Sequence, residues 1–227
     1  MSNGNRPRQL ALALDHSVSF ARDDFLSGPS NAAALALIES WPGWPSRAVA
    51  LVGPEGSGKS HLAAIWAGQS GARLVAARAL TATNLPVALA TGALVVEDAA
   101  GGEFDERAFF HLLNLAREDQ AFLLVTARTP LAAWPVGIRD LASRLKALPV
   151  VAMSSPGDAL LRAVLVKLFA DRQLAADESL LSYLLTHIER SFAAVRAVAA
   201  RLDQEALRRK RPLTRALAAE ILRAGEP

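Results

Sequence analysis

The stretch that most constrains this chain is residues 53–60, Gly-Pro-Glu-Gly-Ser-Gly-Lys-Ser, which fits the phosphate-loop pattern G-x-x-x-x-G-K-[ST]. The apolar segment 48–52 before it is long enough for one buried strand, and the segment 61–67 after it has no proline or glycine to interrupt a helix. A loop between a strand and a helix points successive N–H groups and a positive helix end at one anion. The pattern therefore predicts a nucleotide site, and a glycine-rich turn with a solvated lysine is the plainer alternative.

The residues of this loop have separate expected roles. Lys59 is expected to reach the terminal phosphates, and Ser60 is expected to ligate a magnesium ion. Phe25 and Leu26 lie just upstream of the loop strand and are candidates for the adenine pocket, although ordinary core packing explains them equally well. The remaining contacts to the nucleotide are expected from Pro54, Glu55, Gly56, Ser57, Gly58 and, through its backbone, His61.

Composition sets limits on the class of protein. The chain has 227 residues, of which 52% are hydrophobic, so it can bury a large core in one domain or in two unequal ones. No apolar run approaches the roughly 20 residues of a membrane span, and no export signal follows the N-terminal arginines. The absence of cysteine excludes disulfides and thiolate metal sites. The net charge of +3 does not by itself require a nucleic-acid partner, and a cytoplasmic location is expected.

Apolar runs alternate with helix-compatible segments over the first two thirds of the chain. This order is typical of a parallel sheet with right-handed crossovers, which binds its ligands at the carboxyl ends of the strands. The expected strands are 48–52, 72–76, 93–98, 121–126 and 148–152. The expected helices are one that ends near 41, then 61–67, 85–91, 106–119 (with Asp105 as its cap) and 138–145.

Two carboxylates end the predicted strand 93–98. In phosphate-loop proteins such a strand supplies one acid to magnesium and a second acid to the attacking water, so Glu97 and Asp98 are candidates for these roles. Two acids solvated at a strand end are the alternative. Thr126 ends the next predicted strand and is expected to point toward the phosphates, or to be an ordinary strand-ending threonine.

The pattern changes after Ser154-Ser155-Pro156-Gly157, where the strand-like runs stop. Four helices are expected at 158–172, 177–188, 191–210 and 214–224, which together predict a small helical domain. Arg196 lies early in the third of these helices, from where it could face the nucleotide. The basic cluster at 208–211 suits acidic partners, but a solvated helix end is the simpler interpretation.

Leucines recur with period two near the N-terminus, at Leu10, Leu12 and Leu14, directly after Gln9. In an extended chain all three leucines point the same way. An edge strand of the domain and a peptide that docks into another protein both fit this spacing, and spacing alone favours the edge strand.

Together these motifs resemble the AAA+ proteins, and most closely the AAA+ core of bacterial DnaA initiators and their shorter relatives, the Hda proteins. The likeness extends from Phe20 to about Leu222. It depends on the stretches 25–31 (Phe-Leu-Ser-Gly-Pro-Ser-Asn), 53–60, Glu97-Asp98, 143–145 (Ser-Arg-Leu) and 191–196 (Ser-Phe-Ala-Ala-Val-Arg). Initiators continue past the helical lid into a DNA-binding domain, and they carry an N-terminal recruitment domain. This sequence ends at Pro227 and has only a short segment before Phe20, so the resemblance to the Hda proteins is favoured.

The resemblance implies a regulator rather than a free-standing enzyme. Hda proteins bind ADP, attach to the replicative sliding clamp (the DNA polymerase III beta subunit) on DNA, and promote hydrolysis of the ATP held by DnaA, which restrains re-initiation of replication. By this likeness Arg144 is the arginine finger offered to DnaA, and Arg196 senses the chain's own nucleotide. The segment at 9–14 looks like the Q-L-x-L-x-L clamp-binding peptide, which reverses the preference for an edge strand. By this likeness the chain contacts DNA indirectly, through the clamp. The resemblance also allows a homodimer of this chain.

The resemblance also divides the chain, into a segment with the clamp peptide at 1–19, an AAA+ nucleotide-binding α/β domain at 20–153 and a helical lid at 154–227. Glu97 precedes Asp98, whereas the usual strand ending is aspartate then glutamate, so weak or absent intrinsic ATPase activity and a resident ADP are expected. Ala127-Arg128 gives no clear polar sensor. A DNA-binding helicase loader that uses residues 208–211, and a small-molecule phosphoryl-transfer enzyme, are the rival interpretations.

Overall fold

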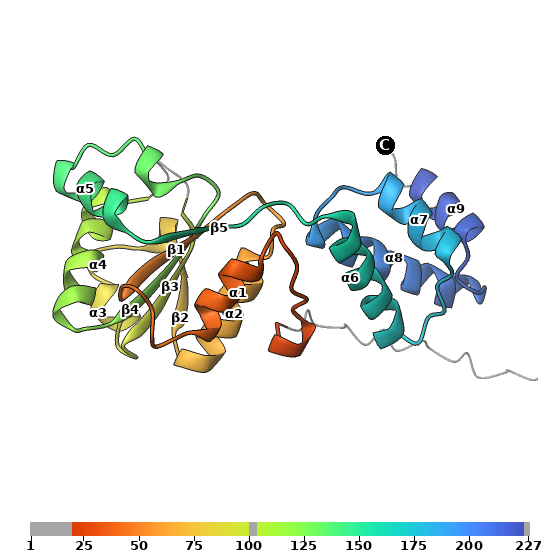
Figure 1. The fold of residues 1–227 in the computed structure, drawn as a ribbon, viewed down its shortest axis with the longest axis horizontal. Helices are drawn as coiled ribbons and strands as arrows, with labels where there is room; N and C mark the ends of the chain where they lie inside the picture. The colour runs from red at the N-terminus through yellow and green to blue at the C-terminus, as the bar shows by residue number, and fades with distance from the viewer. Residues whose placement is uncertain (1–19, 100–103, 225–227) are drawn as a thin grey trace, which may run out of the picture.

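The computed structural model describes residues 20–99 and 104–224, which form a parallel sheet flanked by helices and a separate group of helices (Figure 1). The strands are β1 (Ala48–Val52), β2 (Arg73–Ala76), β3 (Ala93–Ala99), β4 (Phe122–Ala127) and β5 (Val150–Ala152). The helices are α1 (Ala32–Glu39), α2 (Lys59–Ser70), α3 (Leu85–Ala88), α4 (Glu106–Glu118), α5 (Arg139–Ala147), α6 (Asp158–Asp171), α7 (Glu178–His187), α8 (Phe192–Arg209) and α9 (Arg215–Arg223). Short 3-10 turns lie at Arg22–Asp24, Ala77–Ala79 and Leu131–Ala133.

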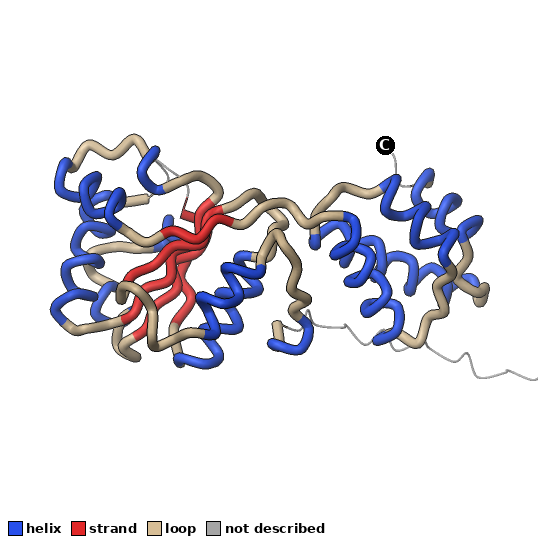
Figure 2. The backbone as a smooth tube through the Cα atoms, viewed as in Figure 1, coloured by secondary structure: helices blue, strands red, loops and turns tan. Residues whose placement is uncertain are grey.

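The five strands pair in the order β2-β3-β4-β1-β5, and every pairing is parallel. Side chains alternate across β1, so Val49 and Leu51 lie in one core while Ala50 and Val52 lie in the other. The first core contains α1 and α2, and the second contains α3, α4 and α5. Helices therefore cover both faces of the sheet (Figure 2), and β1 is central, between β4 and β5.

Helices α6 to α9 pack around a third core of their own, whose largest fully buried side chain is Phe169. Figure 1 shows this helical part beside the sheet, joined to it by the segment after β5. The stretch before α1 contacts both parts, because Phe25 belongs to the core of α1 and α2 while Leu26 packs against the helical core. This stretch therefore fastens the two parts together at a second place.

The predicted fold class, a parallel α/β sheet followed by a helical part, is confirmed. Asp105 caps α4 as expected, since its carboxylate accepts from the backbone N–H groups of Arg107 and Ala108. Strand β5 begins at Val150 rather than Leu148, because Leu148 ends helix α5. The leucine-containing segment at 9–14 lies outside the described residues. In 20–99 and 104–224, no helix is both long and apolar enough to cross a membrane.

The helical core offers a matched test of this packing. Leu165 on α6 is fully buried, whereas Leu207 on α8 is 63% exposed. We expect Leu165→Ala to lower the free energy of unfolding by about 2–5 kcal/mol, because it removes buried methyl groups and leaves a cavity. Leu207→Ala is expected to change it by less than about 0.5 kcal/mol. Urea denaturation followed by circular dichroism measures both, and equal effects would contradict this packing.

Candidate nucleotide-binding site

The phosphate loop leaves the carboxyl end of β1 and leads directly into α2. Because β1 is central in the sheet, the loop emerges at the middle of the carboxyl edge. Gly56 and Gly58 have φ angles of +72° and +100°, a left-handed conformation that glycine adopts without steric cost. The loop conformation therefore requires glycine at these two positions of the pattern.

The start of α8 contacts this loop. The backbone N–H of Phe192 donates to the Gly56 carbonyl at 3.2 Å, and a Cβ built on Gly56 would lie 2.5 Å from the Ser191 Cβ. The Ser191 hydroxyl caps α8 by accepting from the Ala194 N–H at 3.1 Å. The positive N-terminal end of α8 therefore faces the same region as the N-terminal end of α2.

A cavity of about 330 Å³ lies between the loop, the carboxyl ends of the strands and α8. Its charged lining consists of three basic and three acidic side chains, and a helix of the C-terminal part contributes one of them. The basic residues are Lys59, Arg128 and Arg196, and the acidic residues are Glu55, Glu97 and Asp98. The other lining residues are Gly56, Gly58, Ser60, Thr126 and Ala193.

Lys59 is held within the loop. Its Nζ donates to the carbonyls of Gly53 and Pro54, both at 2.7 Å. Burial lowers the pKa of Lys59, and the nearby Arg128 charge lowers it further. An anion placed in the cavity would offset both effects, so this lysine is suited to bind phosphate.

The two carboxylates of β3 lie on the cavity wall but differ in environment. The register between β3 and β4 shifts after Val96, and Asp98 has a φ of +51°, so the strand is irregular where its acids lie. The Asp98 N–H donates to the Thr126 hydroxyl at 3.1 Å. The buried Glu97 Oε1 has no hydrogen-bond partner among the described residues. An unpartnered buried oxygen near Ser60 fits a magnesium site, and Ser60 and Glu97 are the residues that would hold the ion.

Arg128 is the site residue that the sequence interpretation missed. Its guanidinium bridges the loop and β3, with Nη1 2.8 Å from Glu55 Oε2 and Nε 3.2 Å from Asp98 Oδ1. It follows β4 directly, so its position just after the strand ending in Thr126 was the signal available in the sequence. An exposed pair of this kind contributes little stability, so phosphate oxygens could compete for the guanidinium.

Of the other residues predicted to contact the nucleotide, some line the cavity and others lie behind its walls. Arg196 lines the cavity from α8, and burial lowers its pKa. His61 lies behind the loop, with edge contacts to the rings of Phe20 and Phe25 at 5.3 and 5.2 Å, and burial lowers its pKa. Phe25, Leu26, Pro54, Ser57 and His61 do not line the cavity; Phe25 and Leu26 pack in the cores on either side of it.

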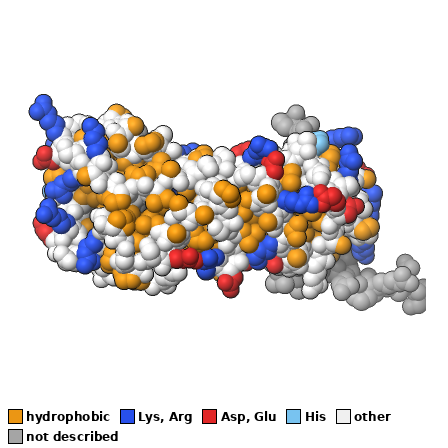
Figure 3. Space-filling model, in the orientation of Figure 1, with side chains coloured by type: hydrophobic (Ala, Val, Ile, Leu, Met, Phe, Trp, Pro, Cys, Tyr) orange, Lys and Arg blue, Asp and Glu red, His pale blue; other side chains and the backbone are white. Residues whose placement is uncertain are grey.

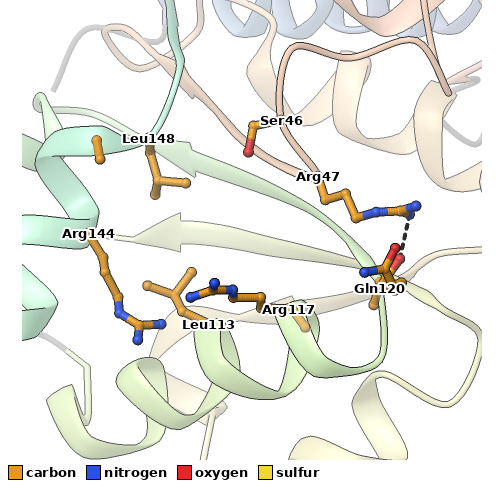
Figure 4. A pocket seen from close by; sticks show the side chains of 10 residues that line it. Ser46, Arg47, Leu113, Arg117, Gln120, Arg144 and Leu148 are labelled. Atoms are coloured by element: carbon orange, nitrogen blue, oxygen red, sulfur yellow. Dashed lines mark hydrogen bonds between the residues drawn. The ribbon is translucent and has the colours of Figure 1, made fainter.

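Arg144 lies apart from this cavity, in a pocket lined by α4, α5 and residues that precede three of the strands (Figure 4). Arg47 precedes β1, Ala121 precedes β4 and Leu148 precedes β5, so the pocket is at the amino edge of the sheet. Strand β1 has 5 residues, so the amino edge and the carboxyl edge of the sheet lie roughly 16 Å apart. Arg144 therefore lies at the edge of the sheet opposite the chain's own phosphate loop.

The basic cluster at 208–211 is largely ion-paired. Arg208 and Arg209 pair with Glu205 at 2.7 and 2.8 Å, and Arg209 and Arg211 pair with Glu220 at 3.0 and 3.3 Å. The Arg208 and Arg209 hydrogen bonds lower the pKa of Glu205 to about 2. These pairs favour the interpretation of the cluster as the solvated end of α8.

This combination of a central-strand phosphate loop, a five-stranded parallel sheet and a helical part over the nucleotide edge is the AAA+ fold, and comparison with solved structures bears this out. Domain III of the Thermotoga maritima replication initiation protein DnaA superposes with a TM-score of 0.75 at 16% identity, over 92% of this chain and 97% of that one. AMPPCP-bound DnaA from Aquifex aeolicus gives 0.64 at 15% identity, over 86% and 70%. The Thermotoga maritima RuvB branch-migration motor gives 0.73 at 17% identity, over 91% and 72%. No protein-family model and no curated protein matches the sequence.

The contact between the loop and α8 predicts a specific glycine effect. Gly56→Ala should weaken ADP binding at least tenfold and lower the melting temperature, because the left-handed conformation costs an L-residue about 1–2 kcal/mol and the new Cβ meets Ser191. Gly68→Ala in α2 is the matched control, since a Cβ there has no neighbour within 4 Å. Titration with a fluorescent ADP analogue measures both; wild-type affinity in Gly56→Ala would contradict the site.

Proposed function

We propose that this chain is a nucleotide-binding AAA+ regulator that stimulates, in trans, the hydrolysis of ATP held by DnaA and so restrains re-initiation of replication, as the Hda proteins do. The observation that carries the proposal is the separation of two charged sites. The phosphate loop with Lys59 and Arg196 is at the carboxyl edge of the sheet, and Arg144 is at the opposite edge. An arginine in that position can act only on a neighbour's nucleotide.

The chain's own cavity is proposed to hold ADP or ATP. Two solved DnaA structures that share this fold are bound to AMPPCP. Lys59 and the loop N–H groups bind the phosphates, and Arg196 reaches them from α8, so nucleotide binding fixes the helical part against the sheet. Ser60 and Glu97 would hold Mg²⁺, which would neutralise part of the phosphate charge when bound.

The two acids at the end of β3 predict slow hydrolysis of a nucleotide bound in this cavity. Asp98, the second acid, is paired with Arg128 and has its backbone fixed by Thr126. The aspartate side chain is also shorter than the glutamate usual at this position, so it reaches less far toward an attacking water. The bound nucleotide therefore acts mainly as a structural part of the protein.

Arg144 is proposed to enter the partner's active site. Its guanidinium carries no ion pair with a described carboxylate and lies 5.0 Å over the Phe110 ring. Placed beside a transferring phosphoryl group, it stabilises the charge on the equatorial oxygens, an effect worth roughly a thousandfold or more. The clamp contact is proposed for Gln9, Leu10, Leu12 and Leu14, which lie outside the described residues.

A reconstituted reaction tests this function. DnaA loaded with labelled ATP is mixed with clamp on DNA and with the wild-type chain, Leu12→Ala or Arg144→Ala. We expect strong stimulation by the wild type, loss of it in both variants, and wild-type stimulation by Leu207→Ala and Arg107→Ala, which change an exposed leucine and an exposed arginine. Full stimulation by Arg144→Ala would refute the finger assignment, and stimulation without clamp would refute the recruitment step.

The rival function is that of a helicase loader or initiator-like protein that acts directly on DNA. The same purified chain and DNA distinguish it from the proposed function. It requires salt-dependent DNA binding by the isolated chain. The ion pairs of residues 208–211 leave less free positive charge for such binding than the sequence suggests.

A further inference from the structure

The pocket that contains Arg144 holds two more arginines. It has a volume of about 470 Å³, and Arg47, Arg117 and Arg144 reach it from three different segments: the start of β1, α4 and α5. Its other lining residues are small, apolar or neutral, and no carboxylate is among them: Ser46, Leu113, Ala116, Gln120, Ala121, Ala147 and Leu148. The pocket is therefore positively charged over an apolar floor.

Among the described residues, no carboxylate neutralises these three guanidiniums. Elsewhere, arginines such as Arg128 and Arg209 each pair with two carboxylates. Over residues 20–99 and 104–224, none of Arg47, Arg117 and Arg144 forms an ion pair. Figure 3 also shows Lys and Arg side chains, with some Asp and Glu among them, at the end of the molecule formed by α3, α4 and α5. Charges left unpaired on one face favour an anionic partner.

The three arginines differ in direction (Figure 4). Arg47 turns away toward Gln120, donating to its carbonyl at 2.6 Å, and lies 4.8 Å over the Phe122 ring. Arg117 points along α4 toward Arg144, past Leu113, and its guanidinium makes no hydrogen bond or ion pair with another described residue. Arg117 and Arg144 are thus the two donors that converge, while Arg47 is already occupied.

We infer that Arg117 is a second phosphate-contacting residue, which acts together with Arg144 on the same triphosphate of the partner; this inference rests on the proposed function. A terminal phosphoryl group offers three oxygens, so it can accept from two guanidinium forks at once, which a single side-chain carboxylate of a partner does less well. The floor of the pocket, Leu113, Ala116 and Leu148, is apolar, so a partner that covers the pocket would make both contacts away from bulk water, where they are stronger. The occupant is therefore a nucleoside triphosphate bound to an adjacent AAA+ protein.

A double-mutant cycle tests this inference. Single-turnover hydrolysis of DnaA-bound ATP is measured with clamp on DNA at saturating wild-type chain, Arg117→Ala, Arg144→Ala and the double variant. We expect Arg117→Ala to lower the saturated rate constant about a hundredfold to a thousandfold, by analogy with removal of one oxyanion donor. The double variant should be within about threefold of Arg144→Ala, because residues that act on one group are not additive. Arg107→Ala, at the other end of α4, should leave the rate unchanged.

Each result has one meaning. If Arg117→Ala gives the wild-type rate at saturation, the inference is overturned but the proposed function stands. The same holds if Arg117→Ala lowers the rate only at low concentration of the chain, because the variant then docks more weakly but does not change the chemical step. Multiplicative losses in the double variant also overturn it, because they place the two arginines on separate groups. No stimulation by the wild type overturns the proposed function itself. Should Arg117→Ala fail to fold, Arg117→Lys replaces it, since lysine keeps the charge but loses the fork and should still lower the rate.

Discussion

The contact between the phosphate loop and the start of α8 is the interaction on which the rest of the structure depends. A single hydrogen bond from Phe192 to the Gly56 carbonyl, and the absence of a side chain at Gly56, allow the helical part to lie against the loop. Two helix N-termini and the cations of two parts of the chain thereby converge on one cavity of about 330 Å³. Without this approach, α8 would lie out of reach of an anion placed at the loop, and the helical part would not be coupled to the site.

The parallel sheet then gives the molecule two chemically distinct edges. At the carboxyl edge, basic and acidic side chains balance one another, and Arg128 links two of the acids. At the amino edge, the arginines remain unpaired among the described residues. This asymmetry is what a protein needs if it holds one nucleotide for its own structure and acts on another that belongs to a neighbour. The fold that carries this asymmetry is shared with domain III of DnaA and with RuvB.

The sequence predicted most of the fold because its local signals agree with one another. The strand at 48–52, the cap at Asp105 and the four C-terminal helices all follow from periodicity and capping, and the structure has them within a few residues. Side-chain pairing across the sheet was not predictable in this way. Arg128 lies in the cavity because β3 and β4 are neighbours with a shifted register. The local sequence pattern predicts neither the pairing of these strands nor their register. Likewise, Arg117 and Arg144 are far apart in the chain and meet only because α4 and α5 cover the same face of the sheet.

Hydrogen exchange on addition of ADP tests the central claim most directly, namely that one nucleotide joins the loop and the helical part. The account predicts that amides at 53–60 and at 191–196 become protected together, at the same ADP concentration, and that Lys59→Ala shows protection at neither. Protection of the loop alone, with 191–196 exchanging as before, would contradict the account, because the nucleotide would then bind without engaging α8.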